Sequence, residues 1–160
     1  MTSGSKQSAP AFSIQLARPE HASKIRNLIL RAGINPTALK WERFLIAITP
    51  HGEFIGCGQI KPQSDGTMEL ASIAVELAWR GRGVARAIID SLLASNPGEL
   101  YLMCQSNLGP LYEKFGFHAI SETEMPTYFR RVSKLAGVLA NLAKAGEHLL
   151  VMRRLSTANG

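Results

Sequence analysis

Apolar positions along the chain recur with two periods, one typical of β-strands and the other typical of α-helices. Extended apolar runs predict strands at residues 12–16, 44–49, 53–61, 67–75, 100–105, 117–120 and 149–152. Apolar residues spaced by three and four, bounded by Pro and Gly, predict helices at 19–32, 35–41, 83–94, 110–114 and 134–145. Strands and helices mixed in this order predict a domain of the α/β class.

The lengths of the connections predict how the strands pair. Turns of a few residues join the strands at 44–49, 53–61 and 67–75, so these three should run antiparallel. Helix 83–94 separates strand 67–75 from strand 100–105, and a helical crossover places the second strand parallel to the first. The sequence therefore predicts a mixed sheet with helices packed against it.

Length and composition fit one domain. The chain has 160 residues, of which 46% are hydrophobic, enough to bury a core. We expect a disordered leader at 1–10, a single domain at 11–155 and a flexible tail at 156–160. No apolar run approaches the roughly 18 residues of a membrane span, and the polar N-terminus lacks the apolar segment of a secretory signal. These features predict a cytoplasmic protein with no membrane partner.

Charge and cysteine content narrow the classes of ligand. The net charge of +6 favours anionic ligands or partners, although a generally basic surface gives the same value. The absence of a long basic run and of a basic stripe with interleaved aromatics disfavours nucleic acid. Cys57 and Cys104 lie inside predicted strands and are expected to be free, buried thiols. The four histidines are scattered, so we expect no metal site.

The stretch from Trp79 to Leu93 joins a glycine-rich turn to the start of a helix. Strand 67–75 precedes the turn Arg80-Gly81-Arg82-Gly83, and an amphipathic helix follows it. A helix start offers free backbone N–H groups and a partial positive charge, and glycines let a ligand approach that backbone closely. This combination predicts a site for a phosphate or pyrophosphate group.

Two segments carry a resemblance to a known family. Val75-Glu-Leu-Ala-Trp-Arg-Gly-Arg-Gly-Val-Ala85 resembles the acetyl-CoA signature of the GNAT superfamily of N-acetyltransferases, with Arg80, Gly83 and Ala85 at its three defining positions. Leu111-Tyr-Glu-Lys-Phe-Gly-Phe117 resembles a second segment of that family. The resemblance implies a mixed, mostly antiparallel central sheet, flanked by helices, that splays open between its fourth and fifth strands.

The resemblance also implies how acetyl-CoA would bind as co-substrate, without a metal. The pyrophosphate would lie against backbone N–H groups of the turn, and the pantetheine arm would pair with the preceding strand. The cofactor-binding residues expected on this basis are Ile73, Ala74, Val75, Arg80, Gly81, Arg82, Gly83, Val84, Ala85, Asn107 and Tyr112. Asn107 follows the fifth predicted strand, at a shorter distance from Tyr112 than in several members of the family.

Tyr112 and Glu69 are the catalytic candidates. A phenol held near the sulfur of a thioester can protonate the departing thiolate, which suits Tyr112, although a packing aromatic is the alternative. Glu69 lies on strand 67–75, where the family often places a base carboxylate. Strict alternation would put it on one face with Ile73 and Val75. An exposed strand-end glutamate, His118 as the base, or water as the base are the other readings.

The acceptor side is less defined by the sequence. Tyr128, Phe129 and Arg130, followed by Arg131, precede the predicted helix at 134–145 and are candidates to line an acceptor pocket. Arginines there would suit an acceptor that carries a carboxylate or phosphate. A surface connection with an aromatic anchor is the alternative interpretation.

The resemblance and the residues together predict an acyltransferase. It would transfer acetyl from acetyl-CoA to a primary amine by direct attack in a ternary complex, without a covalent intermediate. The alternative is a non-catalytic acyl-CoA-binding or sensing module on the same fold. The acceptor, a small molecule or a protein amine, and a homodimeric state are left open by the sequence.

Overall fold

The computed structural model describes residues 11–142 and 148–157 and contains a seven-stranded sheet in the order β1-β2-β3-β4-β5-β7-β6. The strands are β1 (Ser13–Leu16), β2 (Phe44–Ile48), β3 (Phe54–Pro62), β4 (Met68–Val75), β5 (Leu100–Gln105), β6 (His118–Ala119) and β7 (Leu149–Arg154). Each lies within or overlaps a predicted strand. All neighbouring strands are antiparallel except β4 and β5, which are parallel. The predicted fold class is confirmed.

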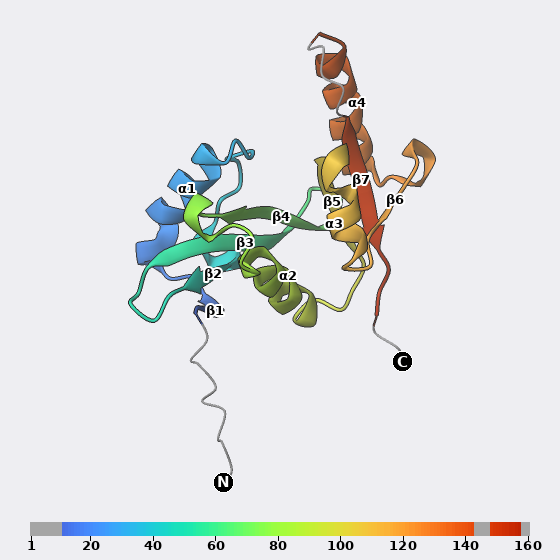
Figure 1. Ribbon diagram of the computed structural model, residues 1–160. Coiled ribbons are helices and arrows are strands. Elements are labelled where there is room, and N and C mark those ends of the chain that lie inside the picture. Colours follow the sequence, from blue (N-terminus) through green and yellow to red (C-terminus); the bar gives the residue numbers. More distant parts are fainter. Residues whose placement is uncertain (1–10, 143–147, 158–160) are drawn as a thin grey trace.

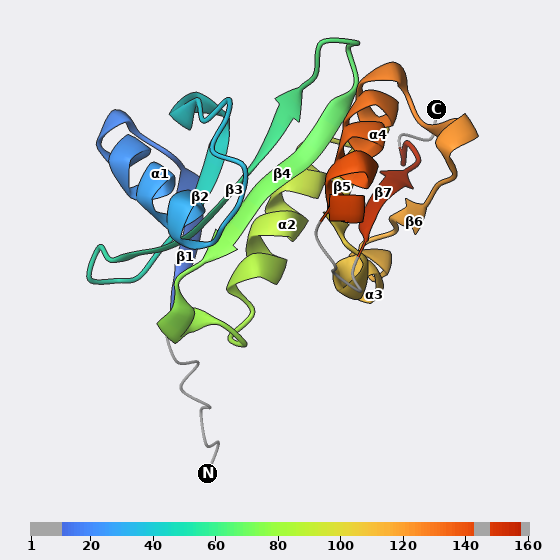
Figure 2. The same cartoon turned by 90° about the horizontal axis from the view of Figure 1, so that it is seen from above.

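Helices cover both faces of this sheet. Helices α1 (Ala22–Arg31) and α4 (Thr127–Leu142) lie on one face, and α2 (Val84–Ala94) and α3 (Gly109–Glu113) on the other (Figures 1 and 2). Short 3₁₀ helices stand at Pro19–His21, Trp41–Arg43, Leu77–Trp79, Ser106–Leu108 and Glu122–Glu124. Apolar side chains line each sheet face under its helices, so the strands of the sheet separate two cores.

The larger core lies between the sheet and α2. Val84, Ile88 and Leu92, one turn apart on α2, are buried against β3, β4 and β5. Under α1 a second core forms around Ile25, Ile29 and the inward residues of β2. Each of these fully buried aliphatic side chains contributes about 1.5 to 3 kcal/mol relative to an exposed one.

Strands β4 and β5 are in register only at Glu69 and Tyr101. Beyond that pair the two strands separate, from Leu70 toward Val75 on β4 and toward Gln105 on β5 (Figure 2). From Leu70 to Val75, β4 is therefore paired on its β3 side and not with β5. The predicted splay between the fourth and fifth strands is present, and we call it the β4–β5 wedge.

A β-bulge interrupts β4 at Ser72. Its φ of 58° is in the left-handed region, and the β3–β4 register shifts between Cys57 and Gln59. One extra residue reverses the alternation, so Leu70 faces α2 before the bulge and Ile73 faces α2 after it. Glu69 consequently lies on the opposite face from Ile73 and Val75. The expectation that the three share a face was wrong.

Two predicted helices differ from the structure. Residues 35–41 do not form a helix, because the Asn35 side chain accepts the backbone N–H of Thr37 and closes a local turn instead. Helix α4 begins at Thr127 rather than at 134, directly after Pro126. Tyr128, Phe129 and Arg130 therefore lie on the first turn of a helix and not in a connection.

The ends of the chain are described in part. The predicted leader at 1–10 and the last three residues of the predicted tail lie outside the described residues, as does 143–147. The backbone N–H of Thr157 donates to Pro97 O at 2.8 Å. The tail predicted from 156 onward is therefore tied to the loop after α2 at its first two residues.

Candidate active site

The loop from Arg80 to Ala85 leads from β4 into α2 at the mouth of the β4–β5 wedge. Gly81 and Gly83 have φ of 74° and 81°, and a Cβ at either position would meet no atom within 4 Å. These glycines therefore serve the turn and leave open space above the backbone, where a ligand can approach. Any other residue would be strained in this conformation.

The same loop presents unpaired donors. Among the described residues, the N–H groups of Gly81, Arg82 and Gly83 have no backbone hydrogen-bond partner. The N–H groups in the first turn of α2 also lack one, because no carbonyl of the helix precedes them. The first turn of α2 carries no acidic residue that would oppose an anion. The residues present thus fit a pyrophosphate group, as the sequence predicts.

The two arginines of the loop are oriented differently. The Arg80 Nε donates to Val75 O at 3.4 Å, so this side chain folds back over the end of β4. The Arg82 guanidinium lies over the Trp79 ring, 5.1 Å from its centroid. Both remain exposed, and both add positive charge beside the loop.

The other expected donor-binding residues lie along the wedge. Ile73, Ala74 and Val75 form the end of β4, where the strand has no β5 partner. Asn107 is exposed in the 3₁₀ turn that follows β5, at the opposite wall of the wedge. The structure therefore places the predicted loop and strand residues along the part of β4 that is not paired with β5.

Tyr112 lies on α3, on the same face of the sheet as α2. Its ring packs edge-on against Phe117, 6.4 Å between centroids, and its neighbours include Cys104 on β5. Its hydroxyl makes no hydrogen bond within the described part of the chain. Burial is the largest cause that raises the pKa of Tyr112, to about 12. The phenol is therefore protonated at neutral pH and free to donate.

Glu69 lies at the closed end of the wedge, on the face that carries α1 and α4. It is 4% exposed, and its Oε2 accepts Gln63 Nε2 and lies 4.0 Å from Lys61 Nζ. Desolvation raises the pKa of Glu69, while the Lys61 charge and the Gln63 hydrogen bond lower it. Its Oε1 has no hydrogen-bond partner among the described residues. This oxygen is not among the polar atoms that are both fully buried and unpaired. That oxygen can take a proton from a ligand.

A second buried polar cluster adjoins the bulge on this face. Gln59 is fully buried, and its Nε2 donates to Ser72 Oγ at 2.9 Å and to Ala38 O at 3.5 Å. Ala38 and Ser72 are the two non-glycine residues of the described chain with positive φ. Backbone strain of this kind concentrates at functional sites. The Gln59 amide therefore joins the segment after α1 to the bulge of β4.

The expected acceptor residues have three different environments. Tyr128 is partly buried near Glu69 and Asp65, and its backbone N–H donates to Asp65 Oδ2. Phe129 is fully buried and stacks on Tyr101, 5.1 Å between centroids. The Arg130 guanidinium donates to backbone carbonyls of Glu122 and Met125 rather than standing free. Of the three, Tyr128 is the one placed beside Glu69.

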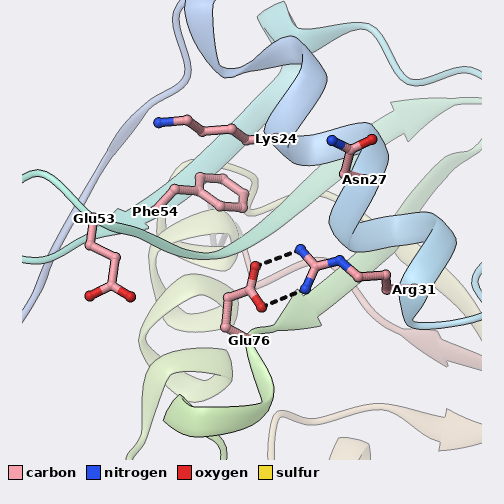
Figure 3. A pocket seen from close by; sticks show the side chains of 6 residues that line it. All are labelled: Lys24, Asn27, Arg31, Glu53, Phe54 and Glu76. Atoms are coloured by element: carbon pink, nitrogen blue, oxygen red, sulfur yellow. Dashed lines mark hydrogen bonds and ion pairs between the residues drawn. The ribbon is translucent and has the colours of Figure 1, made fainter.

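A shallow pocket of about 300 Å³ lies under α1, at the far end of β4 from Glu69. Figure 3 shows Arg31 of α1 and Glu76 after β4 joined by two hydrogen bonds of 2.9 and 2.8 Å, with Lys24, Asn27, Glu53 and Phe54 around them. This ion pair ties α1 to the residue that directly follows β4. It contains no group of the candidate chemistry.

Neither cysteine has the features of a nucleophile. Cys57 and Cys104 are free and buried, as predicted. Desolvation raises the pKa of Cys57 to about 12 and also raises that of Cys104, so both thiols stay protonated at neutral pH.

The described residues contain no group of three or more His, Cys, Asp or Glu side chains that could hold a metal ion. None of the described helices combines the length and apolar character needed to cross a bilayer.

Sequence reasoning missed the groups around Glu69, although a signal existed. Lys61 and Glu69 are equally far from Asp65, the centre of the predicted turn, so a symmetric hairpin pairs them. Gln59 is two residues before Lys61 on β3, so alternation along the strand places both side chains on the same face. The bulge at Ser72 had no comparable signal, because serine is an ordinary strand residue.

Residues 40–119, half of the chain, match a family model described as an acetyltransferase (GNAT) domain. The fold, with its glycine turn between β4 and α2, agrees with this match. The chain therefore belongs to the GNAT acetyltransferase family. A comparison with curated proteins by sequence found no match.

Solved structures with the same fold include three informative neighbours. Rv2747 of Mycobacterium tuberculosis, solved with CoA, is 20% identical with a TM-score of 0.69, over 89% of this chain and 98% of that one. The ribosomal-protein-S18-alanine N-acetyltransferase of Escherichia coli is 17% identical with a TM-score of 0.66, over 93% and 96%. N-acetylglutamate synthase of Neisseria gonorrhoeae, solved with coenzyme A and L-arginine, is 19% identical with a TM-score of 0.68, over 92% of this chain and 34% of that one.

Proposed function

We propose that the protein is an N-acetyltransferase that moves acetyl from acetyl-CoA to a primary amine by direct attack in a ternary complex. The observation that carries the proposal is the β4–β5 wedge. An anion-binding loop stands at its mouth, and two titratable groups, Tyr112 and Glu69, stand on opposite faces of the sheet along it. Membership of the GNAT family and neighbours solved with CoA support acetyl-CoA as the donor.

The wedge sets the position of the donor. With the pyrophosphate against the N–H groups of Gly81 to Ala85, the pantetheine arm would follow the unpaired side of β4 from Val75 inward. Six residues of extended strand separate Val75 from Glu69, about 20 Å at strand spacing. An extended pantetheine arm would therefore carry the thioester from the loop toward the closed end of the wedge.

Glu69 is the proposed base. An amine is protonated at neutral pH and must lose a proton before it can attack a carbonyl carbon. Glu69 Oε1 would accept that proton on the α1 and α4 face and release it to solvent. Its raised pKa brings it closer to neutral pH than an exposed glutamate, which makes it a better base there.

Tyr112 is the proposed donor to the leaving group on the other face. As the nitrogen bonds to the carbonyl carbon, the carbon–sulfur bond breaks and negative charge develops on sulfur. The protonated Tyr112 hydroxyl would hydrogen-bond this sulfur and pass it a proton, while the second proton of the attacking nitrogen replaces the one given. The products are the acetylated amine and free CoA thiol, with one proton released to solvent.

The acceptor face suggests where the amine enters. Glu69 and Tyr128 lie beside each other at the β3–β4 hairpin, with Asp65 adjacent. Arg130 is occupied by backbone carbonyls, so a carboxylate or phosphate on the acceptor is not part of the proposal. A small molecule or a protein amine fits equally.

Two measurements test the proposal. Calorimetric titration with CoA should show saturable binding, and thiol release from acetyl-CoA should occur with at least one member of a library of amino acids, polyamines and peptides. Glu69→Gln should lower kcat roughly 100-fold or more with that acceptor. Binding without release for any amine would favour a sensing module, and failure to bind CoA would overturn the proposal entirely.

A further inference from the structure

The β3–β4 hairpin places two opposite charges face to face at the closed end of the wedge. Lys61 and Glu69 are register partners on adjacent strands, 7% and 4% exposed, with Nζ and Oε2 4.0 Å apart. Side chains directly opposite each other on antiparallel strands are held at short range by the backbone itself. The pairing is therefore a fixed feature of the hairpin and not a chance surface contact.

Stability alone does not account for this pair. Removing two charges from water is costly, and apolar residues of similar volume in place of a buried ion pair are often as stable or more so. A buried lysine opposite the proposed base therefore points to the chemistry of that base.

We propose that Lys61 is a positioning residue for Glu69: its ammonium holds the buried carboxylate in the charged form and occupies Oε2, which leaves Oε1 for the acceptor amine. The inference rests on the proposed function, in which Glu69 takes the amine proton. Without a cation opposite it, a carboxyl group this deeply buried is driven toward its neutral form, which cannot accept a proton.

No other described group can replace the lysine. Gln63 donates to the same Oε2 but carries no charge. Tyr128, on α4, is the other titratable neighbour; burial raises the pKa of its phenol, which carries no positive charge in either form. On β5 the register partner Tyr101 directs its hydroxyl to Glu99 at 2.5 Å, with Arg153 beside it. Within the described residues, Lys61 is the one cation recorded within 4.0 Å of Glu69.

The direct test measures the Glu69 carboxyl without any substrate. Carbon-13 NMR of carboxyl-labelled protein gives the Glu69 pKa, with Glu69→Gln identifying the resonance. In Lys61→Met the pKa should rise by about 1 to 3 units relative to the wild type, the effect of losing an opposite charge at this distance. Lys61→Arg, which keeps the charge, should stay close to the wild type. Gln63→Leu, which removes a neutral donor, should shift it less than Lys61→Met.

The pH profile gives the functional counterpart. The acidic limb of kcat/KM should move to higher pH in Lys61→Met by the same number of units, so activity below the limb falls about tenfold per unit. In Lys61→Arg the acidic limb of kcat/KM should lie at the same pH as in the wild type. A merely structural role would lower activity at all pH values without moving the limb.

The outcomes separate the two proposals. An unchanged Glu69 pKa in folded Lys61→Met overturns the positioning role, whatever the activity. If Lys61→Met does not fold, the same comparison is made with Lys61→Gln. A wild type that binds CoA but acetylates no amine overturns the proposed function, while the NMR comparison still decides whether Lys61 controls Glu69.

Discussion

Individual side chains in the wedge are defined by burial and by unused hydrogen-bonding capacity. The Tyr112 hydroxyl and Glu69 Oε1 have no partner among the described residues, and Gln59, whose Nε2 donates to Ser72 Oγ, has a buried Oε1 without a partner. Neither the Tyr112 hydroxyl nor Glu69 Oε1 is among the polar atoms that are both fully buried and unpaired. Both atoms therefore stay available to hydrogen-bond a ligand in the wedge.

Tyr112→Phe tests the residue that is proposed to donate a proton to the leaving group. The ring and its contact with Phe117 are kept, and only the hydroxyl is lost. We expect kcat to fall roughly 10- to 1,000-fold with a good acceptor, because the developing thiolate loses its proton donor. Steady-state thiol release measures this. The matched control is Tyr101→Phe, whose hydroxyl donates to Glu99 instead. An equal loss in both variants, or unchanged kcat in Tyr112→Phe, contradicts the assignment.

At the scale of elements, the loop between β4 and α2 combines two requirements in two glycines. Gly81 and Gly83 satisfy the turn, because their φ is positive, and they leave space above the loop. Gly52, in the β2–β3 hairpin, has a similar φ of 83° and is equally unobstructed. A substitution at Gly52 therefore shows the effect of backbone strain alone, and the same substitution at Gly83 adds any effect on a bound ligand.

Gly83→Ala should weaken CoA binding, while Gly52→Ala should not. Both variants place a Cβ in a left-handed conformation and should lose about 1 kcal/mol of unfolding free energy. Only Gly83→Ala adds an atom where a pyrophosphate would approach, so its Kd for CoA should rise roughly tenfold or more. Calorimetry and denaturant unfolding measure the two effects. Equal Kd values would remove the loop from the binding site.

The ion pair between Arg31 and Glu76 ties α1 to the end of β4. The Arg31 hydrogen bond is the largest cause that lowers the pKa of Glu76. Its contribution to stability is therefore present above the unfolded pKa and lost as pH falls through the folded value, which is the lower one. Because Arg31 is 61% exposed, Glu76→Gln should cost at most about 1 kcal/mol. Urea unfolding of the wild type and Glu76→Gln at pH 7 measures the contribution of the ion pair to the unfolding free energy. The same comparison at pH 3 shows whether that contribution is lost in acid.

Local sequence patterns predicted most elements and missed those decided by specific contacts. Alternation and spacing located the seven strands of the described residues, and Gly83 marked the end of the turn that leads into α2. Asn35 and Pro36 resemble a helix start, but the Asn35 side chain binds Thr37 within a turn. Phe129 sits on the first turn of α4 because it stacks on Tyr101, 28 residues earlier, a contact that helix periodicity does not encode.

The candidate site was predictable in the same uneven way. Motifs in the sequence predicted the positions of the glycine turn before α2 and of Tyr112 on α3, because both depend on neighbouring residues. The face occupied by Glu69 depends on a bulge at Ser72, and the role of Gln59 depends on strained backbone at two distant positions. These features arise from strand pairing and cannot be derived from residue spacing.

The whole molecule consists of two sheet halves joined at one register pair. Strands β1 to β4 with α1 and α2 form one half, and β5, β7 and β6 with α3 and α4 form the other. Glu69 and Tyr101 are the pair between them. Helix α2 contributes to the core beneath both halves. A ligand that lies along the wedge would add hydrogen bonds where the sheet has none.

CoA should therefore stabilise the whole chain and protect one particular edge. Binding to the folded state alone adds about 2.7 kcal/mol to the unfolding free energy at 100 times Kd, measurable by denaturant unfolding. Hydrogen exchange should slow at the amides of Leu70 to Val75 and of Gly81 to Ala85, because these backbone groups lack protein partners on the wedge side. Amides of β1 and β2 are already paired within the sheet. Their exchange should slow only as far as the higher unfolding free energy of the whole chain requires. Protection confined to α1 and its pocket, with no change along β4, would place CoA elsewhere on the molecule and contradict the wedge as the donor site.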